Sequence, residues 1–145
     1  MPTPVIAIFD IGKTNKKLFL FDEDYRIVFE NSESLPEIKD EDGEACEDLQ
    51  KLEDFIRQSV EKIFSKKEFD VRAINFSAYG ASLVYIDEKG NPLTPLYNYL
   101  KKYPAPLQKK FYDQYGGEKK FSLETASPVL GSLNSGMQLY RIKHE

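Results

Sequence analysis

The sequence predicts an α/β domain with a mixed sheet, whose first three strands are antiparallel neighbours and whose later part supplies flanking helices. Three observations support this fold class. Three short apolar segments lie within residues 5–30, and their connections are shorter than the roughly dozen residues that a parallel crossover needs. A long segment with helical periodicity begins near residue 48, and another strand-like segment follows at residues 71–77.

Five strands are expected. Residues 5–9 (VIAIF) form a continuous run of apolar, strand-favouring residues, which is typical of a strand buried on both faces. Residues 18–21 (LFLF) and 26–30 (RIVFE) are expected to form the second and third strands. Residues 71–77 (VRAINFS) and 82–87 (SLVYID) are expected to form the fourth and fifth, after the first helix.

The clearest helical pattern begins after Asp48. Apolar residues recur there at intervals of three and four, with charged residues between them: Leu49, Leu52, Ile56, Val60 and Ile63. We expect this helix to end near Lys66, because positive charge suits the C-terminal end of a helix. Shorter helices are expected at residues 107–115 and 118–126, and from about residue 133 to the end.

The last of these helices reaches residue 145 without the Gly, Pro or polar tail that usually ends a helix. We therefore expect the chain to be a piece of a larger protein. The expected order of strands and helices also leaves one face of the sheet short of helical cover. Uncovered sheet surface would let a homodimer form artificially, so such a dimer would carry no biological meaning.

The composition excludes several classes of protein. The 145 residues are 41% hydrophobic and 30% charged, as in a globular chain of one domain. The net charge of −4 argues against a nucleic-acid-binding protein. A single Cys and a single His exclude an internal disulfide and a Cys/His zinc site. No secretory signal and no apolar run of about 18 residues is found, so we expect a soluble cytoplasmic protein without membrane contacts.

Residues 37–48 (EIKDEDGEACED) are expected to form an acidic, exposed connection. Its acidic residues do not have the spacing of an EF-hand, so we interpret Glu44 and Glu47 as solvated loop charge and not as metal ligands. Cys46 lies in the same segment with no basic neighbour to activate its thiol, so a catalytic cysteine is not expected.

Residues 10–17 (DIGKTNKK) contain Gly-Lys-Thr, the ending of a P-loop. A P-loop needs a second glycine before this triplet and a helix directly after it. Ala7 occupies the position of that glycine, inside an apolar strand, and the residues after the loop have the pattern of a strand. Both requirements fail, which excludes a P-loop.

Two interpretations of this loop remain. The first is a simple β-hairpin turn, because Gly and Asn tolerate unusual backbone angles. The second is a phosphate site of another kind, since backbone and hydroxyl donors in a hairpin can bind phosphate much as helix N-termini do. Asp10 could hold Mg²⁺ through water, because Mg²⁺ takes few carboxylates. The phosphate donors would be Gly12, Lys13, Thr14, Asn15, Lys16 and Lys17.

The pattern of strand, D-x-G-x-T-[NS] and strand resembles the first phosphate motif of the actin-like ATPase (ribonuclease H-like) superfamily. Residues 74–99 and 125–143 extend the resemblance to the N-terminal part of FGGY-family carbohydrate kinases. Their AYGAS and TASPVLGSLNSGMQLYRIK stretches resemble the family's sugar-contacting segment and the region leading into its next helix. The resemblance covers essentially the whole chain. It implies an incomplete ribonuclease H-like fold, with residues 1–145 as a partial N-terminal domain.

The resemblance also implies chemistry, namely phosphorylation of a small-molecule sugar with ATP and Mg²⁺. The candidate sugars are ketoses such as xylulose, ribulose, fuculose and rhamnulose. By position, Asp10 would help to place Mg²⁺, and Lys17 would be the basic residue that opens the second strand. One of Lys16 and Lys17 is expected to be merely an exposed strand end, since neighbours on a strand face opposite ways. The residues implied to contact ATP phosphates are Gly12, Lys13, Thr14, Asn15 and Lys17.

On the sugar side, Tyr79 stands before Gly80, where xylulose kinases often have His and glycerol kinase has Arg. A phenol can hydrogen-bond a hydroxyl and stack on a sugar ring, so both residues are candidates for substrate binding. Tyr99 is a further candidate, together with its neighbours Tyr97 and Asn98. Packing of these tyrosines in a core is the competing interpretation.

The family's general base and adenosine pocket belong to regions outside these residues, so we expect no sugar phosphorylation by the chain alone. An ATP-driven chaperone or filament protein would share the scaffold, but the AYGAS stretch argues against it. A stand-alone sugar- or nucleotide-binding module without catalysis is the remaining alternative.

Overall fold

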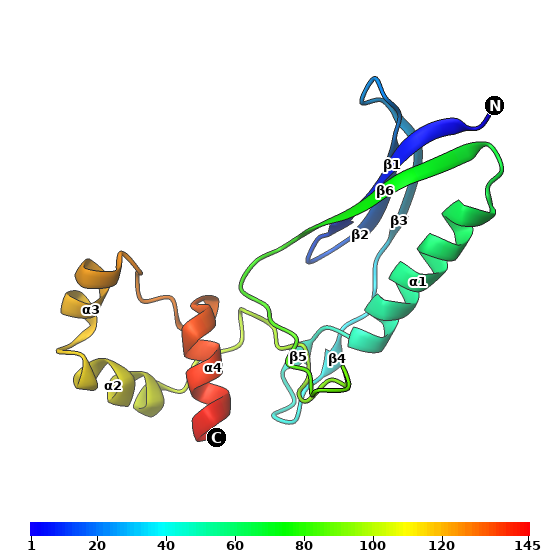
Figure 1. The fold of residues 1–145 in the computed structure, drawn as a ribbon. Helices are drawn as coiled ribbons and strands as arrows, with labels where there is room; N and C mark the ends of the chain where they lie inside the picture. Colours follow the sequence, from blue (N-terminus) through cyan, green and yellow to red (C-terminus); the bar gives the residue numbers. More distant parts are fainter. The chain divides into compact units, whose positions relative to one another are not determined.

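A computed structural model describes all residues from 1 to 145, and the chain divides into two compact units. The first comprises residues 1–38 and 47–80 and is called the sheet unit. The second comprises residues 39–46 and 81–145 and is called the helical unit. The elements of each unit are labelled in Figure 1.

The sheet unit contains a four-stranded sheet with the order β3-β2-β1-β6. Strand β1 is antiparallel to β2 and parallel to β6, and β2 is antiparallel to β3 (Figure 1). The predicted mixed sheet with three antiparallel N-terminal strands is therefore confirmed. The strands are β1 (Thr3–Ile11), β2 (Lys16–Phe21), β3 (Ile27–Glu33) and β6 (Phe69–Ala78).

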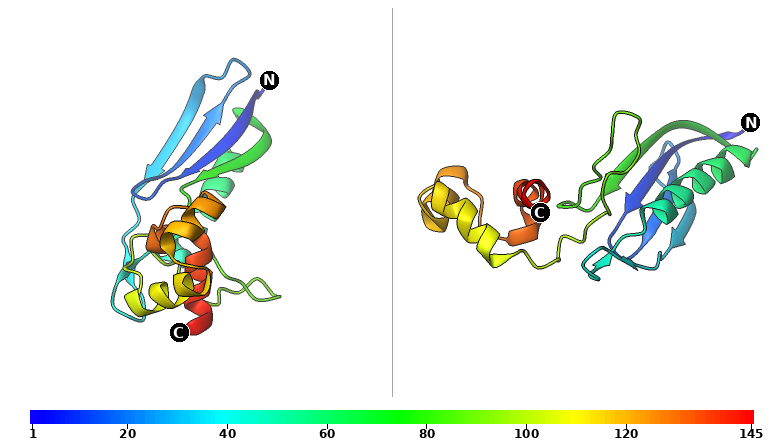
Figure 2. Two further views of the ribbon diagram at one scale, coloured as in Figure 1. Left: turned by 90° about the vertical axis from the view of Figure 1, so that its left-hand side faces the viewer. Right: turned by 90° about the horizontal axis from the view of Figure 1, so that it is seen from below.

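Helix α1 (Leu49–Ser65) lies along one face of this sheet (Figure 2) and confirms the predicted helix. It begins after Asp48, whose side chain accepts a hydrogen bond from the backbone N–H of Lys51 at 3.1 Å. This cap satisfies one of the backbone donors that a helix leaves unpaired at its start. The helix is part of the connection that lets β6 return parallel to β1.

The core of the sheet unit lies between α1 and the sheet. Alternate side chains of β1 and β2 meet α1 there: Val5, Ala7, Phe9, Ile11, Leu18, Leu20, Phe55 and Ile63. Only this face of β1 is buried, whereas Ile6 on the other face is 43% exposed. The prediction that β1 is buried on both faces is therefore wrong, because no helix of the sheet unit covers the second face.

A short two-stranded sheet separates β3 from α1. Strands β4 (Ile38–Lys39) and β5 (Ala45–Cys46) pair, and Asp40 closes their turn by accepting hydrogen bonds from the backbone of Asp42 and Glu44, each at 3.0 Å. Cys46 is buried. The prediction of a simple exposed connection is therefore wrong here, because the turn folds back on itself and buries part of the segment.

The helical unit contains α2 (Ala105–Gln114), α3 (Glu118–Thr125), a 3₁₀ turn (Gly131–Leu133) and α4 (Ser135–His144). All three predicted helices are present. Tyr103, Tyr112 and Met137 form their small core, where the hydroxyl of Tyr103 donates to the carbonyl of Met137 at 3.0 Å. None of the helices has the length and hydrophobicity that a membrane span requires.

The predicted strand at residues 82–87 is absent. Only one isolated antiparallel bridge forms there, between Ile86 and Pro92. Asp87 accepts hydrogen bonds from the backbone of Lys89 and Asn91, which reverses the chain at once. The segment pairs only with the three residues after this turn, where the backbone N–H of Leu93 donates to the carbonyl of Tyr85 at 2.8 Å and that of Asp87 to the carbonyl of Asn91 at 2.9 Å, so the pairing is too short to form a strand.

We expect Phe55→Ala to destabilise the chain by about 3 to 5 kcal/mol, the usual range for removing a buried aromatic ring. Phe55 is 4% exposed and meets Phe9 edge to face, with 6.3 Å between ring centroids. Urea unfolding measures the free-energy change. The matched control is Phe64→Ala on the exposed side of α1, where the ring is 61% exposed. Equal losses for both variants would contradict this account of the core.

Candidate functional site

The turn between β1 and β2 is a tight hairpin. The backbone N–H of Gly12 donates to the carbonyl of Asn15 at 3.0 Å. A Cβ atom at position 12 would lie 2.8 Å from that same oxygen, which is too close for any other residue without a shift of the backbone. Strand β2 follows the turn directly, so the exclusion of a P-loop is confirmed. The hairpin itself explains the glycine.

The strand pairing places three polar residues in one row. Asp10 of β1 is paired with Lys17 of β2 on one side and with Ser77 of β6 on the other. Paired residues on neighbouring strands share a face. This is the face opposite α1, because Ile11 and Phe9 on either side of Asp10 belong to the core. The sheet unit thus presents a carboxylate, an ammonium and a hydroxyl beside the hairpin.

Thr14 lies at the tip of the hairpin and is exposed, as is Asn15. Neither the hydroxyl nor the backbone N–H of Thr14 makes a hydrogen bond within the chain. These donors, with the exposed carboxylate of Asp10, fit a magnesium-bound phosphate. No group of three or more acidic, His or Cys side chains is arranged around a metal. Mg²⁺ near Asp10 would therefore be held through water, with its direct ligands being water and phosphate oxygens.

The two lysines at the start of β2 have different surroundings. Lys16 is 1% exposed, and its Nζ lies 2.9 Å from Oε2 of Glu47. It also donates to the backbone carbonyl of Lys13 at 3.1 Å. Lys17 is half-buried on the opposite face, 3.7 Å from Glu30. The two side chains do face opposite ways as predicted, but neither is the exposed strand end that was expected.

Glu47 lies beneath the hairpin, where its other oxygen is 3.1 Å from Nζ of Lys13. Lys13 also pairs with Glu37. Glu47 is 4% exposed, so its interpretation as solvated loop charge is wrong. Burial opposes its charge, but the hydrogen bonds from Lys16 and Lys13 outweigh burial and lower the pKa of Glu47. Burial likewise opposes the charge of Lys13, yet the two carboxylates raise its pKa.

Tyr79 and Gly80 follow β6 and lie next to the hairpin. The backbone N–H of Tyr79 donates to the carbonyl of Ile11 at 3.1 Å, which continues the β1–β6 ladder. The ring of Tyr79 is half-buried against the core of the sheet unit. Gly80 is exposed, does not have a positive φ, and has no atom within 4 Å of a Cβ built on it. The packing of the chain therefore does not explain this glycine.

Tyr99 belongs to the helical unit, so the predicted substrate residues are divided between the two units. It is half-buried in a turn that Asn98 closes by accepting hydrogen bonds from Leu100 and Lys101, both at 2.9 Å. The role of Asn98 in this turn is structural.

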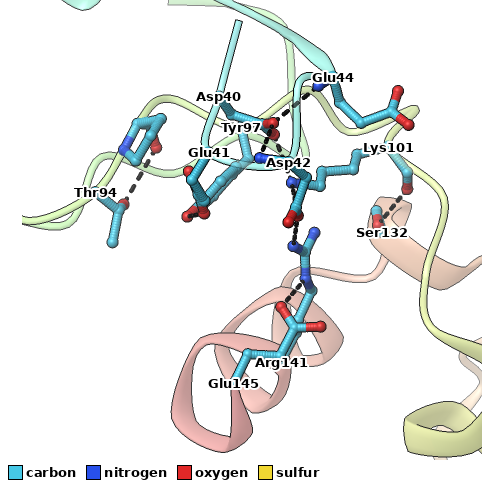
Figure 3. Close-up of polar contacts among 11 residues, drawn as sticks. Asp40, Glu41, Asp42, Glu44, Thr94, Tyr97, Lys101, Ser132, Arg141 and Glu145 are labelled. Atoms are coloured by element: carbon cyan, nitrogen blue, oxygen red, sulfur yellow. Dashed lines mark hydrogen bonds and ion pairs between the residues drawn. The ribbon is translucent and has the colours of Figure 1, made fainter.

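The helical unit contains an ion-pair cluster that the sequence analysis missed (Figure 3). Lys101, whose side chain is 4% exposed, pairs with Asp40 and lies 2.7 Å from Asp42. Arg141 lies 3.0 Å from Asp42 and also pairs with Glu145. Asp40 lies in a segment that was expected to be solvated, but its side chain is 0% exposed, whereas that of Asp42 is 55% exposed. The burial of Asp40 could have been suspected only if its partner Lys101, far along the chain, had been known.

The charged groups of the cluster shift one another's pKa values. Burial opposes the charge of Lys101, but its hydrogen bonds to Asp40 and Asp42 outweigh burial and raise its pKa. Burial and a hydrogen bond to Glu41 both raise the pKa of Tyr97. Lys101 and Arg141 also lie near the Tyr97 ring, at 4.9 and 5.5 Å from its centroid, within the range of cation–π attraction.

A cavity of about 230 Å³ adjoins this cluster, lined by polar side chains that include Thr94, Tyr97, Lys101, Ser132 and Arg141. The hydroxyl of Ser132 donates to the carbonyl of Lys101 at 2.6 Å. Because Lys101 and Arg141 already have carboxylate partners, the cavity offers hydrogen-bonding groups and no unpaired positive charge.

Residues 5–142 match the family model of the FGGY family of carbohydrate kinases, N-terminal domain. The chain belongs to this family. FGGY-family proteins are carbohydrate kinases, so the chain is related to enzymes that transfer a phosphoryl group. No curated protein matches it.

Several solved structures share the fold of this FGGY-family chain. A carbohydrate kinase from Novosphingobium aromaticivorans is 20% identical over 95% of this chain and 28% of its own, with a TM-score of 0.76. Gluconate kinase from Lactobacillus acidophilus is 21% identical over 90% of this chain and 26% of its own, with a TM-score of 0.70. Ligand-bound xylulose kinase from Lactobacillus acidophilus is 22% identical over 82% of this chain and 24% of its own, with a TM-score of 0.66. The predicted ribonuclease H-like (actin-like ATPase) fold is confirmed, and the chain spans about a quarter of these proteins.

In the FGGY-family chain, Lys101→Met is expected to destabilise the fold by about 3 to 5 kcal/mol, because it leaves Asp40 buried without its charged partner. Urea unfolding measures the loss. Lys102→Met removes the same charge from an exposed neighbour that makes no ion pair, and should change stability by less than about 0.5 kcal/mol. Similar losses for the two variants would show that the cluster contributes little.

The stability of the chain is expected to fall in acid partly because of Glu47. Its pKa is lower in the folded chain than the ordinary value of about 4.3, so its ion pairs stabilise the fold fully above that pH. This contribution disappears as the pH falls through the folded pKa. Thermal midpoints measured between about pH 7 and pH 3 should therefore fall further for the wild type than for Glu47→Gln. Glu44→Gln, an exposed control, should follow the wild type.

Proposed function

We propose that the chain is part of the N-terminal domain of an ATP-dependent sugar kinase of the cytoplasm, and that its β1–β2 hairpin contacts the phosphates of the nucleotide. The observation that carries this proposal is the row of Asp10, Lys17 and Ser77 beside a hairpin in which the hydroxyl and the backbone N–H of Thr14 have no partner in the chain. Family membership supports phosphoryl transfer to a carbohydrate.

Each hairpin residue has a proposed role. Bound ATP would supply the phosphoryl group, with Mg²⁺ offsetting part of its negative charge. Asp10 would hold the metal through water. In the Gly12–Asn15 turn, Gly12 would let the phosphate approach closely, while the backbone N–H and hydroxyl of Thr14 and the side chain of Asn15 would donate hydrogen bonds to its oxygens. Lys17 would place its ammonium near the developing charge, where preorganised electrostatics contributes most. Lys13 would contribute through its backbone, because Glu37 and Glu47 hold its ammonium.

We propose that Tyr79 and Gly80 contribute to the sugar site. Gly80 leaves open space that packing does not require, and close approach of a ligand would explain it. The phenol of Tyr79 can hydrogen-bond a sugar hydroxyl. A ketose such as xylulose, ribulose, fuculose or rhamnulose remains the proposed substrate, and Tyr99 remains a further candidate contact. The general base is proposed to lie outside these residues, so the chain alone should not turn over ATP with sugar.

Titration of the ¹⁵N-labelled chain with ADP and Mg²⁺ is expected to shift the amide resonances of residues 10–17. Thr14→Ala should weaken the apparent affinity about fivefold, because it removes one hydroxyl donor worth roughly 1 kcal/mol. Asp10→Asn should abolish the dependence of binding on Mg²⁺. Thr125→Ala, an exposed threonine of α3, is the control and should bind as the wild type does.

Absence of any shift in the hairpin at saturating Mg²⁺ and ADP would overturn the proposed phosphate contact. Sugar-dependent ATP turnover by the 145-residue chain, above that of Thr14→Ala, would overturn the proposal that the catalytic base lies elsewhere. The two measurements test different parts of the proposed function.

A further inference from the structure

A fully buried ion pair beneath a surface hairpin needs an explanation other than stability. Lys16 and Glu47 are 1% and 4% exposed. Removing two charges from water costs free energy that their attraction only partly restores, and apolar residues of similar volume often stabilise a fold equally well or better. The alternation of β2 would accept an apolar residue at position 16, since Leu18 and Leu20 occupy the same face.

The pair does something that apolar residues could not do, which is to hold the hairpin backbone. Nζ of Lys16 donates to the carbonyl of Lys13 at 3.1 Å while Oε2 of Glu47 holds the same ammonium at 2.9 Å. Oε1 of Glu47 binds the ammonium of Lys13 at 3.1 Å, so one carboxylate fixes both lysines. Glu47 itself is anchored, because it directly precedes the cap residue of α1.

The held carbonyl sets the direction of the neighbouring N–H. The peptide bond between Lys13 and Thr14 is planar and trans, as are all peptide bonds of the chain, so its C=O and N–H point in opposite directions. With the carbonyl directed at buried Lys16, the N–H of Thr14 is directed away from the ion pair. That N–H has no partner in the chain, and Thr14 is exposed.

We propose that Glu47 is a positioning residue for the phosphate hairpin, which acts through Lys16 and the Lys13 carbonyl to keep the Thr14 N–H directed at the nucleotide phosphate. This inference rests on the proposed function. The inference assigns two different roles to the residues of this region. Thr14 and Lys17 contact the phosphate, whereas four side chains hold the turn in place without contacting it: Lys13, Lys16, Glu37 and Glu47.

The test compares the wild type with Glu47→Gln and with the double variant Lys16→Met/Glu47→Leu, which replaces the ion pair by apolar side chains. The amide resonance of Thr14 is followed during titration with ADP and Mg²⁺. Both variants should bind about tenfold more weakly or worse, the size typical of lost outer partners of a site. The double variant should keep a thermal midpoint near that of the wild type. Glu44→Gln is the matched control and should behave as the wild type.

Hydrogen exchange of the Gly12 amide, which is bonded to Asn15, supplies a readout without nucleotide. Protection of Gly12 in the double variant, together with weakened binding at Thr14, supports a role in directing one peptide. Unchanged binding in a folded double variant overturns the inference alone. Loss of Gly12 protection and of the thermal transition in both variants also overturns it, because the pair is then only structural. No response of wild-type Thr14 to ADP and Mg²⁺ overturns the proposed function, and the inference with it.

Discussion

Strand β1 is paired on both edges, and this constraint determines where Asp10, Lys17 and Ser77 lie. Its side chains must alternate between a face covered by α1 and a face that α1 leaves open. Apolar residues occupy the first face, and Asp10 therefore falls on the second. The same pairing brings Lys17 and Ser77 to either side of Asp10. The polar row is thus a consequence of strand register and needs no special loop conformation.

The sequence was sufficient to predict what local patterns control. Periodicity located α1, the four strands of the main sheet and the three later helices, and the residues after Thr14 excluded a P-loop. The sequence was not sufficient to predict the structure of residues 82–87, because alternation of apolar residues indicates a strand only if a long enough neighbouring segment pairs with it. Alternation predicts which side chains are buried within a strand, but it does not say whether both faces of β1 are covered.

The sequence analysis also failed to predict which charged residues are buried, and both failures had one cause. Asp40 and Glu47 lie in an acidic segment that has every local property of a solvated loop, yet each is paired with a lysine far away in the sequence. A signal existed only for Glu47. Lys16 stands at a core-facing position of β2, and a buried lysine requires a carboxylate partner. For Asp40, the partner Lys101 follows a turn with no periodic pattern, so nothing local indicates that it is buried.

The hydrogen bond from the Tyr79 backbone to Ile11 also bears on how such a protein can diversify. Any residue except proline can donate this bond, so the backbone at position 79 is tied to β1 whichever side chain stands there and packs against the core. Another side chain that packs equally well could then replace the tyrosine while the adjoining hairpin keeps its geometry. One strand pair would in this way join a constant part of the site to a variable one, with the boundary between them at a single peptide.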